Sequence, residues 1–196
     1  MIKSGEKADC ADVAIAALIR VASQEGLPLR LRYYADGKWK HFDSRDDAYS
    51  SPEQYEAEMR NNLGAQNIFD NTRAVKNYEQ VEAGDIFLYD LRFHRKRNRE
   101  AGQPPPEYTG HTMPVLGVGR EPGKEAEYTV AEGHTSAQRG EGTRIDARTY
   151  TESAIKSKFP NRYADDTGPR GLRAGENESY RLLEEGARSW RFEDFN

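Results

Sequence analysis

The pattern of apolar and polar residues in 7–22 predicts one buried helix near the amino terminus. Asp9 is a suitable N-cap, because its carboxylate can accept hydrogen bonds from the amides of the first turn. Apolar side chains recur at helical spacing in two stripes: Cys10, Ala14, Ala17, Leu18 and Val21, and Ile15, Ile19 and Ala22. A narrow face is left for water by Asp12, Ala16 and Arg20. A helix that is apolar over most of its circumference is buried, and Gly26 and Pro28 end it.

Alternating and continuous apolar runs predict strands in the middle of the chain. Residues 29–34 alternate between apolar and basic side chains, and Asp36-Gly37 predicts a hairpin turn into residues 38–42. Ser51 followed by Pro52 predicts the start of a further helix. Buried strands are predicted for the continuous apolar runs at residues 86–89, 110–118 and 127–131, of which the last two form a hairpin.

The last third of the chain predicts smaller elements and an anchored tail. A short strand is expected at residues 144–146 and a short helix at 151–159. Residues 180–196 hold too many large apolar side chains for a free tail, so part of this tail should dock as a helix or edge strand. We therefore expect an α+β fold in one domain spanning residues 1–196. This domain has an insertion at about residues 43–80 and a C-terminal extension from about residue 150.

Composition excludes several classes of protein. The single cysteine among 196 residues rules out an internal disulfide framework and a cysteine-rich zinc site. A net charge of -4 does not indicate that the chain binds nucleic acid. The basic cluster at residues 95–99 has no aromatic side chains beside it on which bases could stack, so we expect a solvated loop there. Without a long apolar run or a signal peptide, the chain is expected to be made in the cytoplasm and not to insert into membranes.

The position of Cys10 suggests nucleophilic chemistry. A cysteine at the amino end of a helix feels the positive end of the helix dipole, which favours the thiolate. The ordinary alternative is that a lone free cysteine is simply a small buried apolar residue.

A histidine and two possible partners are expected close together on the second hairpin. His111 begins one strand, and Glu132 and His134 lie at the end of its partner strand, so antiparallel pairing brings them near each other. A cysteine hydrolase needs a thiol, a histidine base and a group that orients the imidazole. Cys10, His111 and Glu132 supply these three groups. His134 is an alternative orienter, because a neutral imidazole nitrogen also accepts a hydrogen bond.

Four short motifs in this order resemble the papain-like NlpC and CHAP cell-wall hydrolases. The motifs are Asp9-Cys10 opening a helix, residues 84–87, Gly110-His111 opening a strand, and residues 130–132 closing its partner. The resemblance implies a papain-like fold, with an N-terminal catalytic helix packed on an antiparallel sheet. It also implies that Cys10 is the nucleophile and His111 the base, with Glu132 as orienter in the CHAP type or His134 in the NlpC type. The amide of Cys10 would form part of an oxyanion hole.

This resemblance leads us to expect a cysteine amidase or endopeptidase acting on peptidoglycan stem peptides. Without a signal peptide or a wall-binding repeat, an antibacterial toxin fits well, delivered into a rival's periplasm by a contact-dependent machine such as type VI secretion. A cognate immunity protein would then be a partner. Two alternatives remain open: a transglutaminase or deamidase acting on protein glutamine, and a catalytically inactive binding module.

No cofactor or metal is expected. A zinc site built from His111, His134 and an acidic residue would lack any closely spaced ligand pair. The other two histidines, His41 and His94, are expected to be ordinary surface groups.

Overall fold

The computed structural model describes residues 7–35, 38–75, 77–90, 110–133, 143–158, 162–163 and 184–191. Its helices are α1 (Cys10–Gln24), α2 (Pro52–Asn62), α3 (Ala65–Asp70), the 3-10 helix η1 (Tyr78–Gln80) and α5 (Glu152–Lys158). The longer strands are β2 (Arg30–Ala35), β3 (Lys38–Asp43), β5 (Ile86–Asp90), β6 (Gly110–Gly119), β7 (Glu127–Glu132), β9 (Asp146–Thr151) and β11 (Glu184–Trp190). Short strands are β1 (Lys7–Ala8), β4 (Thr72–Ala74), β8 (Thr143–Arg144) and β10 (Arg162–Tyr163).

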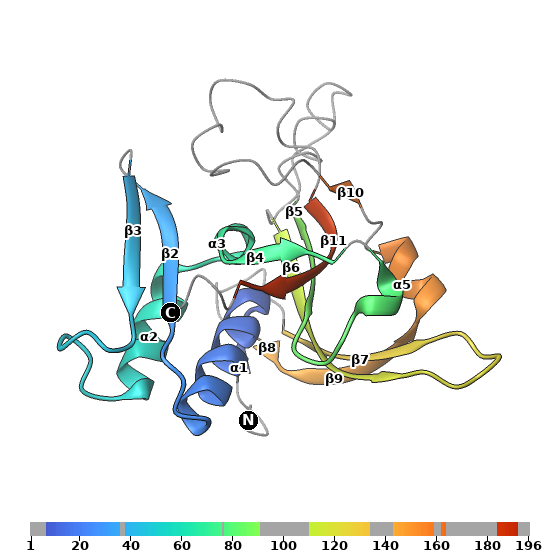
Figure 1. Ribbon diagram of the computed structural model, residues 1–196, viewed down its shortest axis with the longest axis horizontal. Coiled ribbons are helices and arrows are strands. Elements are labelled where there is room, and N and C mark those ends of the chain that lie inside the picture. The colour runs from blue at the N-terminus through green and yellow to red at the C-terminus, as the bar shows by residue number, and fades with distance from the viewer. Residues whose placement is uncertain are drawn as a thin grey trace.

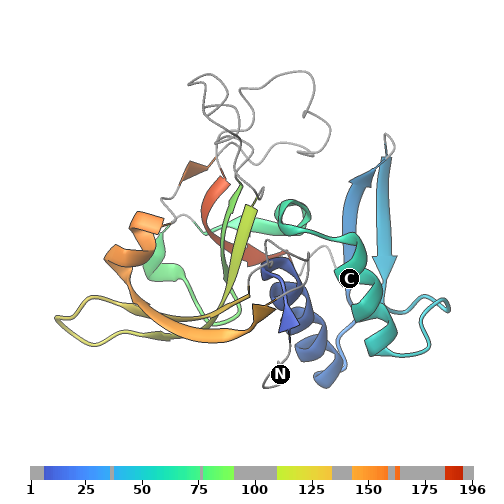
Figure 2. The same cartoon turned by 180° about the vertical axis from the view of Figure 1, so that it is seen from behind.

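These elements form an α+β fold in which the paired strands are antiparallel (Figures 1 and 2). The main sheet has the strand order β10-β11-β5-β6-β7-β9, and β4 also pairs with β11. The strands β2 and β3 form a separate hairpin, and β1 pairs with β8. The predicted hairpin at residues 29–42, the strands β5, β6 and β7, and the helices α1, α2 and α5 are therefore confirmed.

The helix α1 begins where its N-cap predicts. The Asp9 carboxylate accepts a hydrogen bond of 2.8 Å from the Asp12 amide, and the Asp12 carboxylate accepts one from the Asp9 amide. The predicted water-facing stripe is wrong, however, because Ala16 is only 2% exposed and Val21 is 55% exposed. The reason is that α2 packs on the stripe formed by Asp12, Ala16 and Arg20, and Val21 is left outside.

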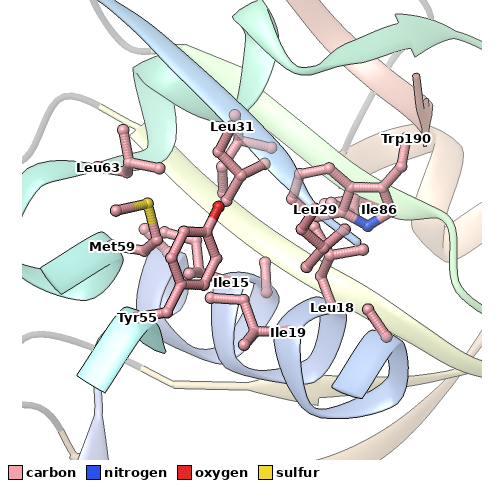
Figure 3. Packing of buried hydrophobic residues seen from close by; sticks show 14 of the residues in the cluster. Ile15, Leu18, Ile19, Leu29, Leu31, Tyr55, Met59, Leu63, Ile86 and Trp190 are labelled. Carbon is pink, nitrogen blue, oxygen red and sulfur yellow. The ribbon is translucent and has the colours of Figure 1, made fainter. Parts of the chain in front are cut away.

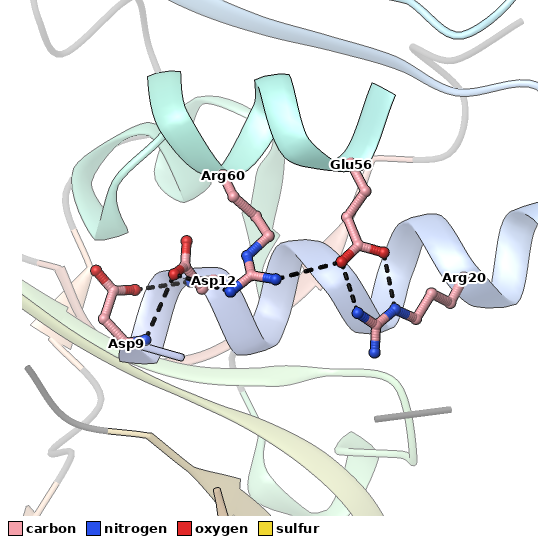
Figure 4. Close-up of polar contacts among 5 residues, drawn as sticks. All are labelled: Asp9, Asp12, Arg20, Glu56 and Arg60. Atoms are coloured by element: carbon pink, nitrogen blue, oxygen red, sulfur yellow. Dashed lines mark hydrogen bonds and ion pairs between the residues drawn. The ribbon is translucent and has the colours of Figure 1, made fainter. Parts of the chain in front are cut away.

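Four charged residues join α1 to α2 (Figure 4). The Glu56 carboxylate accepts hydrogen bonds of 2.7 and 2.6 Å from the Arg20 guanidinium. Arg60 lies 3.4 Å from Glu56 and 3.3 Å from Asp12, in the first turn of α1. Segments from the predicted insertion therefore cover one side of the helix that carries Cys10.

Apolar side chains gather on both faces of the main sheet. Figure 3 shows the larger cluster, in which α1 and α2 pack against residues of β2, β5 and β11. Side chains alternate along β5, so Ile86 and Leu88 belong to this cluster, whereas Phe87 belongs to a second cluster on the opposite face. The second cluster also contains Met113 of β6 and Ile155 of α5.

The C-terminal segment docks on the fold, as predicted, but not as an edge strand. β11 pairs with β5 on one side and with β4 and β10 on the other. Its Arg188 side chain is 2% exposed and donates hydrogen bonds to the hydroxyl and the carbonyl oxygen of Thr72, at 2.8 and 2.9 Å. Strand pairing on both sides makes this segment an interior part of the sheet.

Candidate active site

Cys10 is the first residue of α1, and its free thiol is half-buried. The start of β6 lies against it. The Thr112 hydroxyl donates a hydrogen bond to the backbone carbonyl oxygen of Cys10, and the Thr112 side chain is fully buried. The helix start therefore contacts the residue that follows His111.

The environment of Cys10 favours the neutral thiol, although the helix dipole favours the thiolate. Burial raises the pKa of Cys10 above its ordinary value, and the negative charge of Asp9 acts in the same direction. Hydrogen bonds from the backbone N–H and the hydroxyl of Thr112 lower this pKa, but burial outweighs them. A thiol in this environment needs a base before it can act as a nucleophile.

The start of α1 contacts both β6 and the end of β7. Among the described residues, pairing of β6 with β7 ends at Val115 and Val130. Continued in the same register, Thr112 would face Gly133. Thr112 instead contacts Cys10, and a Cβ atom on Gly133 would lie 2.7 Å from the carbonyl oxygen of Ala8. The absence of a side chain at Gly133 is therefore what lets the helix start approach the end of β7.

His111 and Glu132 lie on the same face of the sheet, opposite the helix. Ala131 packs with Ala8 and Val13 on the α1 side, so the alternation along β7 turns Glu132 to the other side. By the same alternation, His111 shares its face of β6 with Met113, and Thr112 faces α1. The thiol contacts the sheet through the Thr112 N–H at the start of β6.

Both of these ionisable side chains are buried. His111 is 6% exposed and Glu132 is 2% exposed. The Tyr150 hydroxyl donates a hydrogen bond of 3.0 Å to the Glu132 carboxylate, and the Arg148 guanidinium lies 3.3 Å from its other oxygen. A buried carboxylate with two donors is held in a fixed orientation, as an orienting group must be.

Of the remaining histidines and the basic cluster discussed above, the structure describes only His41. His134, His94 and the basic cluster at 95–99 lie outside the described residues. His41 is exposed on β3, as expected for a surface histidine. In the part of the chain that the structure describes, no three His, Cys, Asp or Glu side chains group as metal ligands.

Two residues of the site, Thr112 and Tyr150, are not among the residues predicted from the sequence. Thr112 was not singled out, although the alternation along a strand beginning with His111 already turned residue 112 toward the helix. Tyr150 had no signal of its own, because its contact with Glu132 depends on the register between β7 and β9, in which Tyr128 pairs with Tyr150.

Comparison with known proteins identifies no relative: no family model, no curated protein and no solved structure matches the chain. No helix in the described part is long and apolar enough to cross a membrane.

Proposed function

We propose that this protein is a papain-like cysteine amidase or endopeptidase of the NlpC or CHAP type, which cleaves amide bonds in peptidoglycan stem peptides. The observation that carries the proposal is the position of Cys10. Cys10 begins a buried helix whose start lies against the strand that begins with His111 and beside the end of the strand that bears the buried Glu132.

In the proposed reaction, the His111 imidazole turns from the face of the sheet opposite α1 toward the Cys10 thiol and takes its proton. The sulfur then attacks the carbonyl carbon of the scissile amide. The Cys10 amide would stabilise the oxyanion. His111 then gives the proton to the leaving nitrogen, the C–N bond breaks, and a thioester remains on Cys10. Water, deprotonated by His111, hydrolyses the thioester to a free carboxylate and restores the thiol. Glu132, or His134 in its place, orients the imidazole.

The raised pKa of Cys10 is compatible with this scheme and makes the base indispensable. A buried thiol that is neutral at rest becomes nucleophilic only when its proton is removed during the attack. The fixed hydrogen bonds around Glu132 support its assignment as the group that orients the base.

Digestion of purified peptidoglycan tests the proposal, with soluble fragments identified by mass. The wild-type chain is expected to release fragments whose masses name the cleaved bond, and Cys10→Ala is expected to release none. Cys10→Ser is a matched control for folding, because it replaces sulfur by oxygen alone. Equal activity of wild type and Cys10→Ala would overturn the cysteine mechanism. If neither protein releases fragments and the wild type instead deamidates protein glutamine, the peptidoglycan substrate is wrong.

We also propose that the enzyme is an antibacterial toxin that acts in the periplasm of a rival cell after contact-dependent delivery. An immunity protein encoded next to its gene would neutralise it. Expression with a periplasmic signal should lyse the host only when Cys10 is intact, and co-expression of the neighbouring gene should protect it. Host growth unaffected by periplasmic wild-type enzyme that is active on purified peptidoglycan would contradict the toxin role.

A further inference from the structure

The β2–β3 hairpin is anchored at its base. Leu31 is only 1% exposed, in the cluster around α1. The Asn71 side chain accepts a hydrogen bond from the Arg32 amide at 2.9 Å and donates one to the Arg32 carbonyl oxygen at 2.8 Å. The Tyr55 hydroxyl donates to the carbonyl oxygen of Phe42 at 3.0 Å. The hairpin stands apart from the main sheet, beside α2 (Figures 1 and 2).

Positive charge is concentrated on this hairpin. The whole chain has a net charge of -4, whereas residues 30–43 carry four lysines and arginines against two aspartates, Asp36 and Asp43. Their register places Arg30 and Arg32 on one face and Lys38 and Lys40 on the other. Residues two apart on a strand are separated by about 7 Å, so each face carries a pair of cations at that spacing. Asp43, at the base, is already bound by Arg45 at 2.7 Å.

Aromatic rings order the two inner cations. The Arg32 guanidinium lies 5.0 Å from the centre of the Trp39 ring and donates one hydrogen bond of 3.1 Å to the carbonyl oxygen of Asp70. The Lys40 ammonium lies 5.7 Å from the centre of the Tyr33 ring. Such cation–π contacts restrict long side chains before any ligand arrives, which reduces the entropy lost on binding. The two outer cations, Arg30 and Lys38, are exposed.

The charges reinforce one another on the Arg30 face. Burial, together with the positive charges of Arg30 and Arg32, lowers the pKa of His41, which lies opposite Arg32 on β3. An electrostatic field of this sign attracts anions, whereas the net negative charge of the chain repels them.

We propose that the β2–β3 hairpin is the docking surface for the acidic peptides of the polymeric substrate, whose free carboxylates bind its two rows of cations. This inference deepens the proposed function and rests on it for the identity of the polymer. An anionic polymer is repelled by the chain as a whole, so the hairpin gives it a defined place to bind. Arginine and lysine at fixed spacing suit carboxylates that recur along such a polymer.

Co-sedimentation of the Cys10→Ala protein with purified, insoluble peptidoglycan tests the docking surface without any need for catalysis. In this background, the double variant Arg30→Gln/Lys38→Gln removes two exposed charges that make no described structural contact. We expect it to weaken binding about fivefold at low salt, and the difference should shrink as salt is added. The matched control is Lys124→Gln/Lys156→Gln, which removes the same charge from exposed positions elsewhere and should bind like the parent.

The outcomes separate the two proposals. Equal binding by the hairpin variant and the parent would overturn the docking surface, even if the wild-type enzyme cleaves peptidoglycan. Loss of binding confined to the hairpin variant would support it, even if the wild type cleaves nothing. A competition experiment with single-stranded DNA and with soluble wall peptides completes the test. If DNA displaces peptidoglycan from the protein at a lower concentration than the wall peptides do, the assignment of the hairpin to acidic peptides is overturned.

Discussion

Thr112 and Cys10 are 102 residues apart in the sequence, and the hydroxyl of the first donates a hydrogen bond to the backbone carbonyl of the second. This contact joins the first turn of α1 to the start of β6. It places the thiol beside the strand that carries His111, at a point where β6 and β7 no longer pair. The position of the candidate nucleophile therefore depends on a residue with no catalytic role of its own.

Replacing Thr112 by valine should lower the free energy of unfolding by about 1 kcal/mol, because one intramolecular hydrogen bond is lost while the volume is kept. Urea denaturation followed by circular dichroism measures the change. Thr112→Ser keeps the hydroxyl but loses the methyl group of threonine. Once the contribution of that methyl group is subtracted, the serine variant should be more stable than the valine variant. A valine variant as stable as wild type would show that the contact contributes nothing.

Replacing Asp9 by asparagine should make Cys10 more reactive at a given pH. The negative charge of Asp9 contributes to the raised pKa of the thiol, so its removal lowers that pKa and increases the thiolate fraction. Asparagine is also a good N-cap, so the helix should persist. The rate of alkylation by iodoacetamide, measured against pH, should have its midpoint at lower pH in Asp9→Asn. A midpoint unchanged from that of wild type would contradict the electrostatic account, and Glu121→Gln, with its exposed side chain, is the control.

Removing the charge of Glu56 should destabilise the packing of α2 on α1. Its carboxylate is 10% exposed and binds both Arg20 and Arg60, so Glu56→Gln removes the charge that both partly buried guanidinium groups share. We expect a loss of about 2–3 kcal/mol in the free energy of unfolding. The control is Glu121→Gln, which breaks an ion pair whose two side chains are 70% exposed and should change stability little. Similar effects of the two substitutions would refute the importance of burial.

Tyr150→Phe should cost about 2 kcal/mol of stability, because the buried Glu132 carboxylate loses a hydrogen-bond donor. Arg148→Gln should cost clearly less, because the Arg148 side chain is 56% exposed and solvent screens its charge. If Glu132 orients His111, Tyr150→Phe should also lower kcat on peptidoglycan, with little change in KM. An effect of Arg148→Gln larger than that of Tyr150→Phe would reverse this assignment.

The sequence predicts the local elements well, because each carries its own signals. Asp9 begins α1, Ser51 and Pro52 begin α2, and the apolar runs become β5, β6 and β7.

Long-range arrangements could not be predicted in the same way. Ala16 is buried because α2 folds back over α1, which no pattern within α1 encodes. β11 lies inside the sheet because it pairs with strands more than 90 residues earlier in the chain. Pairing of β6 with β7 ends at Val115 and Val130, and beyond that point the helix start contacts both strands, which simple hairpin pairing does not include.

The most direct test of the account is the time course of new amino groups released from purified peptidoglycan by wild type, Cys10→Ala and His111→Ala at equal concentration. Hydrolysis of an amide bond frees one amino group for each bond cut. We predict steady release by the wild type and none above background by either variant, provided that both variants show the circular dichroism spectrum of the folded protein. Release by a folded Cys10→Ala variant at the wild-type rate would contradict it.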